Sequence, residues 1–135
     1  MGGWTTEFAG RLVLMKLSHI NITMPRGGED SARRFYSDLL GLPEVQKPEP
    51  IRTRGGVWFD IGGRDLHISV EEQRTGSDGQ RHFGLECSDL ESLRAVLQSA
   101  GVVVDSGRPV PWKRFFVHDP FGNRIELHEP GAFRG

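Results

Sequence analysis

An internal repeat constrains this chain of 135 residues more than any other feature of its sequence. The segments 63–67 (Gly-Arg-Asp-Leu-His) and 122–126 (Gly-Asn-Arg-Ile-Glu) align at a constant offset of 59 residues, and each has a residue that can bind metal four positions after a turn glycine. Two histidines open comparable segments upstream, so each half begins and ends with a candidate ligand: His19 and His67 in the first half, His82 and Glu126 in the second. The repeat predicts two copies of one supersecondary unit.

The first half has the pattern of a βαβββ unit. Residue types and periodicity predict a helix at 32–40 and strands at 12–23, within the proline-interrupted stretch 43–50, at 56–61 and at 66–70. Gly41 directly follows the helical pattern, as expected for a helix C-terminus, because glycine adopts the left-handed conformation at little cost. Gly62 and Gly63 favour a hairpin turn between the last two strands.

The second half repeats this order. The sequence predicts a helix that begins at the capping box Ser88-Asp89-Leu90-Glu91 and stops at Gly101, and strands at 82–87, 102–104, 114–117 and 124–128. Asp119-Pro120-Phe121-Gly122 is typical of a turn. We therefore expect one domain made of two modules, 12–73 and 80–130, preceded by a loose leader at 1–11.

Composition and charge exclude several classes of partner. The formal net charge is -1, the pI is about 6.5, and the basic residues are scattered, so no strong field attracts nucleic acid or anionic lipid. No apolar stretch has the length of a membrane span, and the N-terminal residues lack a signal-peptide pattern. The single Cys87 excludes an internal disulfide, which fits a reducing compartment. We expect a cytoplasmic protein that binds neither nucleic acid nor membranes.

Strand alternation places all four candidate ligands on polar strand faces. Successive side chains point to opposite faces of a strand, so each candidate ligand lies opposite apolar residues that can pack under a helix. For any single histidine, a solvent-exposed sheet face would give the same pattern. Four such residues at matching places in two repeats favour a metal site instead. Three imidazoles and one carboxylate suit zinc, nickel, iron or manganese.

Three motifs resemble the vicinal oxygen chelate superfamily, which includes glyoxalase I, extradiol dioxygenases and bleomycin resistance proteins. The motifs are Leu17-Ser18-His19-Ile20, Phe35-Tyr36-Ser37-Asp38-Leu39-Leu40-Gly41-Leu42 and Asp119-Pro120-Phe121-Gly122-Asn123-Arg124-Ile125-Glu126-Leu127, and the resemblance covers residues 16–130. It implies an α+β fold in which two βαβββ modules form a cupped mixed sheet, with helices on its outer face, around one divalent metal ion. In that family the metal acts as a Lewis acid on two neighbouring oxygens of the substrate.

The resemblance also implies roles for individual residues. His19, His82 and Glu126 match the ligands that most metal-dependent members share, and Glu126 is expected to take part in catalysis as well. His67 lies where glyoxalase I has a fourth ligand, usually glutamate, so the histidine is a departure. Metal ligation and a role beside the metal or the substrate both stay open for His67.

Three more residues are candidates for contact with a small-molecule substrate. Arg114 and Phe116 alternate along one strand, so they share a face, and Arg114 can hold an anionic group. Trp58 is a candidate aromatic wall. Each has an ordinary alternative, which is an edge-strand face for Arg114 and Phe116 and a core or dimer-interface position for Trp58.

These features predict a divalent-metal-dependent enzyme of the lyase or isomerase type that acts on a small oxygenated organic molecule chelated to the metal. Without His67, the ligands His19, His82 and Glu126 form a set of two histidines and one carboxylate, which suits an iron-dependent extradiol-type dioxygenase. A non-catalytic antibiotic-binding resistance protein is a further alternative. Several small members of the family join modules across a two-fold axis, so we also expect a homodimer whose metal sites are shared between chains, with pairing of the modules within one chain as the alternative.

Overall fold

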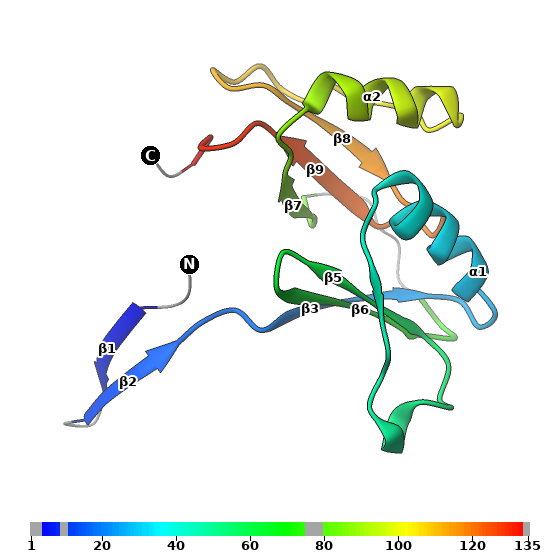
Figure 1. The fold of residues 1–135 in the computed structure, drawn as a ribbon. Helices are drawn as coiled ribbons and strands as arrows, with labels where there is room; N and C mark the ends of the chain where they lie inside the picture. Colours follow the sequence, from blue (N-terminus) through cyan, green and yellow to red (C-terminus); the bar gives the residue numbers. More distant parts are fainter. Residues whose placement is uncertain (1–3, 9–10, 75–79, 134–135) are drawn as a thin grey trace.

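The computed structural model of the protein describes residues 4–8, 11–74 and 80–133 (Figure 1). Its strands are β1 (Trp4–Phe8), β2 (Arg11–Met15), β3 (His19–Met24), β4 (Glu44–Val45), β5 (Val57–Ile61), β6 (Arg64–Val70), β7 (Phe83–Glu86), β8 (Arg114–His118) and β9 (Arg124–His128). Its helices are α1 (Glu29–Ala32), which continues as the π-helical segment η1 (Arg33–Leu39), the 3₁₀ turn η2 (Glu49–Ile51) and α2 (Leu90–Ser99). No described helix is both long and apolar enough to cross a membrane.

The first module has the predicted βαβββ order. Its four strands form one mixed sheet in the order β3-β6-β5-β4, in which β3 and β6 run parallel and the other neighbours run antiparallel. The helix ends where the sequence predicts, because Gly41 has a φ of 77° and its N–H donates to the Ser37 carbonyl at 3.0 Å.

The second module repeats this plan with one difference. Its sheet has the order β7-β9-β8, with β7 and β9 parallel, and α2 begins where the Asp89 carboxylate accepts the Ser92 N–H at 3.1 Å. The predicted strand at 102–104 is wrong, since only the bridge between Asp105 and Phe116 forms there. The Val102 N–H is held by the Leu97 carbonyl at the end of α2, and it is therefore not available for a ladder.

The N-terminal region also differs from the sequence-based expectation. Residues 4–8, expected to belong to a loose leader, form β1, which pairs antiparallel with β2. Figure 1 shows this hairpin extending away from the two modules. The predicted strand at 12–23 is interrupted at 16–18. The reason is that β6, the strand that pairs with β3, begins only at Arg64, after the glycine turn. The pairing therefore starts with His19 opposite Asp65.

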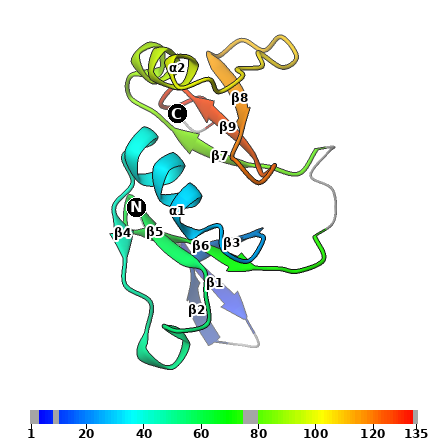
Figure 2. The same ribbon diagram turned by 90° about the vertical axis from the view of Figure 1, so that its right-hand side faces the viewer.

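The two modules share one hydrophobic core but not one sheet. The buried core joins side chains from both modules: Met24, Tyr36, Phe59, Leu66 and Ile68 with Leu97, Phe115, Ile125 and Leu127 among others. Figure 2 shows α1 between the two sheets, with α2 beside β8. The outer strands β3 and β7 are not hydrogen-bonded to each other, so the single cupped sheet that the resemblance implies is two separate sheets in one chain.

A buried carboxylate connects the modules. Asp119, in the turn between β8 and β9, is only 4% exposed, and its Oδ2 accepts the Tyr36 O–H from η1 at 2.6 Å. The same carboxylate accepts the backbone N–H groups of Phe121 and Asn123 and the Asn123 side-chain amide. A buried charge is tolerated when it is fully hydrogen-bonded, so the turn motif holds the first-module helix against the second module.

Tyr36→Phe is predicted to lower the free energy of unfolding by about 1–3 kcal/mol, because it removes a donor from a buried carboxylate and leaves the ring in place. Burial raises the pKa of Tyr36 well above its ordinary value, and the charge and hydrogen bond of Asp119 raise it further. The folded state therefore holds this proton more tightly than the unfolded state does. Wild-type stability should be fully present below a pH of about 10 and fall as the pH rises above it.

Urea unfolding of both proteins at neutral and alkaline pH measures these effects. Ser69→Ala is a suitable control, because it removes an exposed hydrogen bond to Asn21 and should change stability by less than about 0.5 kcal/mol. Equal stabilities of Tyr36→Phe and wild type at neutral pH would show that this hydrogen bond does not hold the modules together.

Candidate functional site

The strand register places the candidate ligands equivalently in the two modules. In the parallel pair β3 and β6, His67 lies opposite Asn21, which is two residues after His19. In the parallel pair β7 and β9, Glu126 lies opposite Gly84, which is two residues after His82. The repeat seen in the sequence is thus a repeat in space, and each module brings its two candidate ligands to one strand pair.

In the first module the two histidines stack. The ring centroids of His19 and His67 lie 4.3 Å apart with an interplanar angle of 19°. Trp58 covers the other face of His67, with centroids 3.6 Å apart and an angle of 7°. Nε2 of His67 lies 3.4 Å from a carboxylate oxygen of Asp65. His67 is therefore held between two rings, whereas His19 is exposed.

The surroundings of His67 favour its neutral form. Burial lowers the pKa of this imidazole below its ordinary value, the contact with Asp65 opposes that effect, and the charge of His19 lowers the pKa further. A neutral imidazole has the free lone pair that a metal ligand needs. The local environment therefore suits the predicted ligand role of His67, although the Asp65 contact competes for the same nitrogen.

In the second module, His82 and Glu126 form a close pair. Nε2 of His82 lies 3.3 Å from Oε1 of Glu126, and Glu126 is a residue that is only 5% exposed. Nδ1 of His82 lies 2.7 Å from the Gln80 carbonyl, which can only accept, so Nδ1 carries a hydrogen. In the neutral ring, the Nε2 lone pair then faces a carboxylate oxygen. Contact between these two atoms is favourable either when Nε2 is protonated or when one metal cation binds both atoms, and the chemistry of this pair fits a divalent metal.

The other oxygen of Glu126 is already occupied. Oε2 accepts from Nη1 of Arg114 at 3.2 Å, and Nη2 of Arg114 donates to the Arg108 carbonyl at 3.0 Å. Arg114, expected from the sequence to bind substrate, thus orients the Glu126 carboxylate with Oε1 toward His82. Its Nε is buried and has no hydrogen-bond partner among the described residues.

The aromatic candidates lie beside the candidate ligands. Phe116 is 4% exposed, and the guanidinium carbons of Arg114 and Arg124 lie 5.0 Å and 3.8 Å from its ring centroid. The rings of His82 and Phe116 form a T-shaped contact with centroids 5.4 Å apart. Phe116 therefore shapes the second-module pair, as Trp58 shapes the first.

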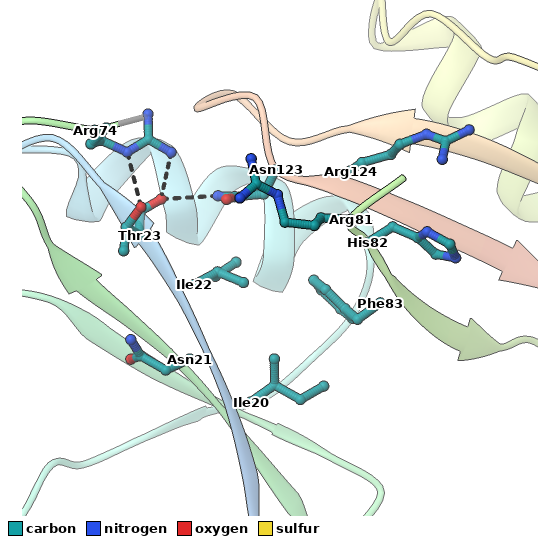
Figure 3. A pocket seen from close by; sticks show the side chains of 10 residues that line it. All are labelled: Ile20, Asn21, Ile22, Thr23, Arg74, Arg81, His82, Phe83, Asn123 and Arg124. Carbon is teal, nitrogen blue, oxygen red and sulfur yellow. Dashed lines mark hydrogen bonds between the residues drawn. The ribbon is translucent and has the colours of Figure 1, made fainter. Parts of the chain in front are cut away.

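One chain does not bring its two ligand pairs together. No group of three or more histidine, cysteine, aspartate or glutamate side chains with metal-binding geometry occurs among the described residues. A pocket between the modules separates the pairs; Ile20, Ile22 and Phe83 line it, and Figure 3 shows them pointing toward one another. His82 and Asn21, which lies opposite His67 in the strand pair, also line this pocket, and in the same view their side chains extend toward opposite sides.

Polar contacts close one end of the pocket between the modules. The guanidinium of Arg74 donates to the carbonyl and hydroxyl oxygens of Thr23 and to the Phe121 carbonyl, and the Asn123 amide donates to the Thr23 carbonyl at 2.9 Å (Figure 3). Two of the residues in these hydrogen bonds are Thr23, which belongs to β3, and Asn123, which belongs to the turn before β9. The residues at this end of the pocket therefore also hold the two modules together.

Sequence reasoning missed two charged residues of the site. Asp65 and Arg124 were not candidates, yet Asp65 contacts His67 and Arg124 lies over Phe116. Strand alternation predicts that both lie on the same face as a candidate ligand, because each comes two residues before such a ligand on the same strand.

Comparison with known proteins identifies the family. The model of the Glyoxalase/Bleomycin resistance protein/Dioxygenase superfamily matches residues 16–127, which include most of both modules and all four candidate ligands. The chain belongs to this superfamily. Among solved glyoxalase structures, a glyoxalase family protein from Bacillus anthracis is 35% identical, with a TM-score of 0.78, and the match covers 88% of this chain and 98% of that one.

Two further proteins resemble this chain more weakly. A protein of Arabidopsis thaliana named Glyoxylase I 4 is 25% identical, and the match covers 90% of this chain and 75% of that protein. The fosfomycin resistance protein FosX from Listeria monocytogenes is 16% identical with a TM-score of 0.71, and the match covers 89% of this chain and 97% of that one. The likeness to FosX shows the fold alone.

Proposed function

We propose that this glyoxalase superfamily member is a divalent-metal-dependent enzyme of the lyase or isomerase type. Its substrate would be a small organic molecule that binds the metal through two neighbouring oxygens. The observation that carries the proposal is the contact between Nε2 of His82 and Oε1 of Glu126 at 3.3 Å, because this arrangement of a lone pair and a carboxylate fits a cation. The superfamily includes glyoxalases, which agrees with this reaction type, although it also includes dioxygenases and resistance proteins.

The complete site would form between two copies of the chain. Each chain has a pair of imidazoles in its first module and a histidine–carboxylate pair in its second, and these pairs lie apart within the chain. In a homodimer with two-fold symmetry, His19 and His67 of one copy would meet His82 and Glu126 of the other. Such a dimer has two equal sites, each with four donors, and an ion that accepts six ligands, such as nickel, iron or manganese, would keep two positions for the substrate oxygens, whereas zinc would have to expand its coordination number beyond four.

The residues around the ligands would then have separate roles. When bound, the metal would supply a Lewis acid that polarises a substrate oxygen. Arg114 holds Oε2 of Glu126, so one carboxylate oxygen keeps a fixed direction toward His82. Glu126, the buried acidic residue next to His82, is also the candidate acceptor of a substrate proton, and this role would fall to Oε1, because Arg114 occupies Oε2. Trp58 and Phe116 would shape the two sides of the site through their ring contacts with His67 and His82.

A mixing experiment tests the shared site. His19→Ala and Glu126→Ala homodimers should each bind little metal, because both of their sites lack one donor. A heterodimer of the two variants has one complete site and one site that lacks two donors. Isolated through different affinity tags, it should hold about one metal ion per dimer, half the wild-type content, as measured by elemental analysis and native mass spectrometry.

The matched control for mixing is a heterodimer of His82→Ala and Glu126→Ala chains, in which both defects lie in the second module. Each of its sites lacks one donor, so metal content should not recover. Recovery in both heterodimers, or in neither despite demonstrated subunit exchange, would contradict shared sites.

One observation favours a second candidate function, an iron-dependent extradiol-type dioxygenase. His67 is stacked between Trp58 and His19, and its Nε2 faces Asp65 at 3.4 Å, so it can stay outside the coordination sphere. The remaining ligands His19, His82 and Glu126 would form the set of two histidines and one carboxylate that serves iron and dioxygen chemistry.

Cobalt substitution separates the two candidates. If His67 is a ligand, His67→Ala should change the visible absorption of the cobalt-loaded protein, because the intensity of these bands reports coordination number and geometry. Ser69→Ala, on the same face of β6, is the control and should leave the spectrum unchanged. An unchanged spectrum in His67→Ala, with iron as the metal that co-purifies, would support the dioxygenase and overturn the lyase or isomerase assignment.

A further inference from the structure

A second cavity opens beside the first-module ligands. Its volume is about 440 Å³, and Trp58 and His67 form one part of its lining. The rest of its polar lining is mainly cationic, with Arg26, Lys47 and Arg54 from three different segments of the chain. No carboxylate lines this cavity among the described residues. The cavity thus joins a candidate metal ligand to a group of positive charges.

The three cations differ in how far they are neutralised. Arg26 forms an exposed ion pair with Glu72 at 2.7 Å, and Lys47 donates to the Gly55 carbonyl near the carboxylate of Glu29. Both carboxylates lie outside the lining of the cavity. Arg54 is exposed and forms no ion pair with any described residue. Its guanidinium is therefore free to bind an oxyanion.

We propose that this cavity binds an oxyanion group, a carboxylate or a phosphate, of the ligand whose other end reaches the metal. The identification of that ligand as the substrate rests on the proposed function, whereas the oxyanion site itself does not. Arginine guanidinium groups bind carboxylate and phosphate oxygens in a fork of parallel hydrogen bonds, and Lys47 adds a point charge. Trp58, which stacks on His67, adds an apolar surface to the same lining.

The charge of the surroundings supports an anionic ligand over a neutral or cationic one. A cationic group would enter a cavity whose lining carries three positive side chains and a candidate metal ligand. Because Arg54 and Arg26 are solvent-exposed, salt screens their attraction, and the site should bind a bare oxyanion weakly. A ligand that also binds the metal would gain from both contacts.

The test uses metal-free protein and two simple probes, inorganic phosphate and acetate, titrated separately at constant pH and ionic strength. Carbon-13 and nitrogen-15 NMR signals of the His67 imidazole and the Trp58 indole should shift in a saturable manner with at least one probe. Arg54→Gln and Lys47→Gln should each weaken the apparent affinity about five- to tenfold. Arg34→Gln is the matched control, because it removes the same charge from an exposed residue that does not line this cavity. It should change the apparent affinity by less than about twofold.

Two results would overturn the proposal. One is the absence of a saturable shift at His67 and Trp58 with either probe, and the other is an equal loss of affinity in Arg34→Gln and Arg54→Gln, which would show an effect of net charge alone. Since the titration contains no metal, these results are independent of metal content, and failure of the oxyanion site would leave the metal proposal standing.

Discussion

The parallel pairing of the first and last strands in each module determines where the chemistry of this protein can occur. In both modules the candidate ligand on the last strand lies opposite a residue of the first strand. That residue comes two positions after the module's other candidate ligand. A shift of either register by one residue would turn one ligand to the helix-covered face, where the apolar core lies. Burial of the alternate apolar side chains therefore fixes the positions of the imidazoles and the carboxylate.

The junction between the modules explains why the ligand pairs stay apart within one chain. The Asp119 carboxylate and the Tyr36 hydroxyl are separated by 83 positions in the sequence, yet they form a buried hydrogen bond at 2.6 Å. Together with the shared core, this bond places η1 against the second module and leaves β3 and β7 as unpaired sheet edges. The two polar strand faces remain available to a second copy, which is the basis of the shared-site proposal.

Much of this arrangement follows from local sequence patterns, and the remainder depends on contacts between distant segments. Alternation predicts that His19, His67, His82 and Glu126 lie on polar faces, because the period of a strand is local. The turn motif at 119–122 predicts a turn, but not that its carboxylate binds a tyrosine of the other module. The stack of Trp58 on His67 and the pairing of Arg114 with Glu126 depend on register across strands. The strand expected at 102–104 does not form, because the Val102 N–H donates a hydrogen bond to a carbonyl at the end of α2.

The central claim is that two copies of the chain assemble each metal site, and anomalous diffraction from crystals of metal-loaded protein tests it most directly. Data collected on both sides of the absorption edge of the bound element identify the metal and locate it. The account predicts one peak per chain, between His82 and Glu126 of one copy and His19 of another. A peak held by His19, His82 and Glu126 of the same chain, or no peak near these side chains, would contradict it.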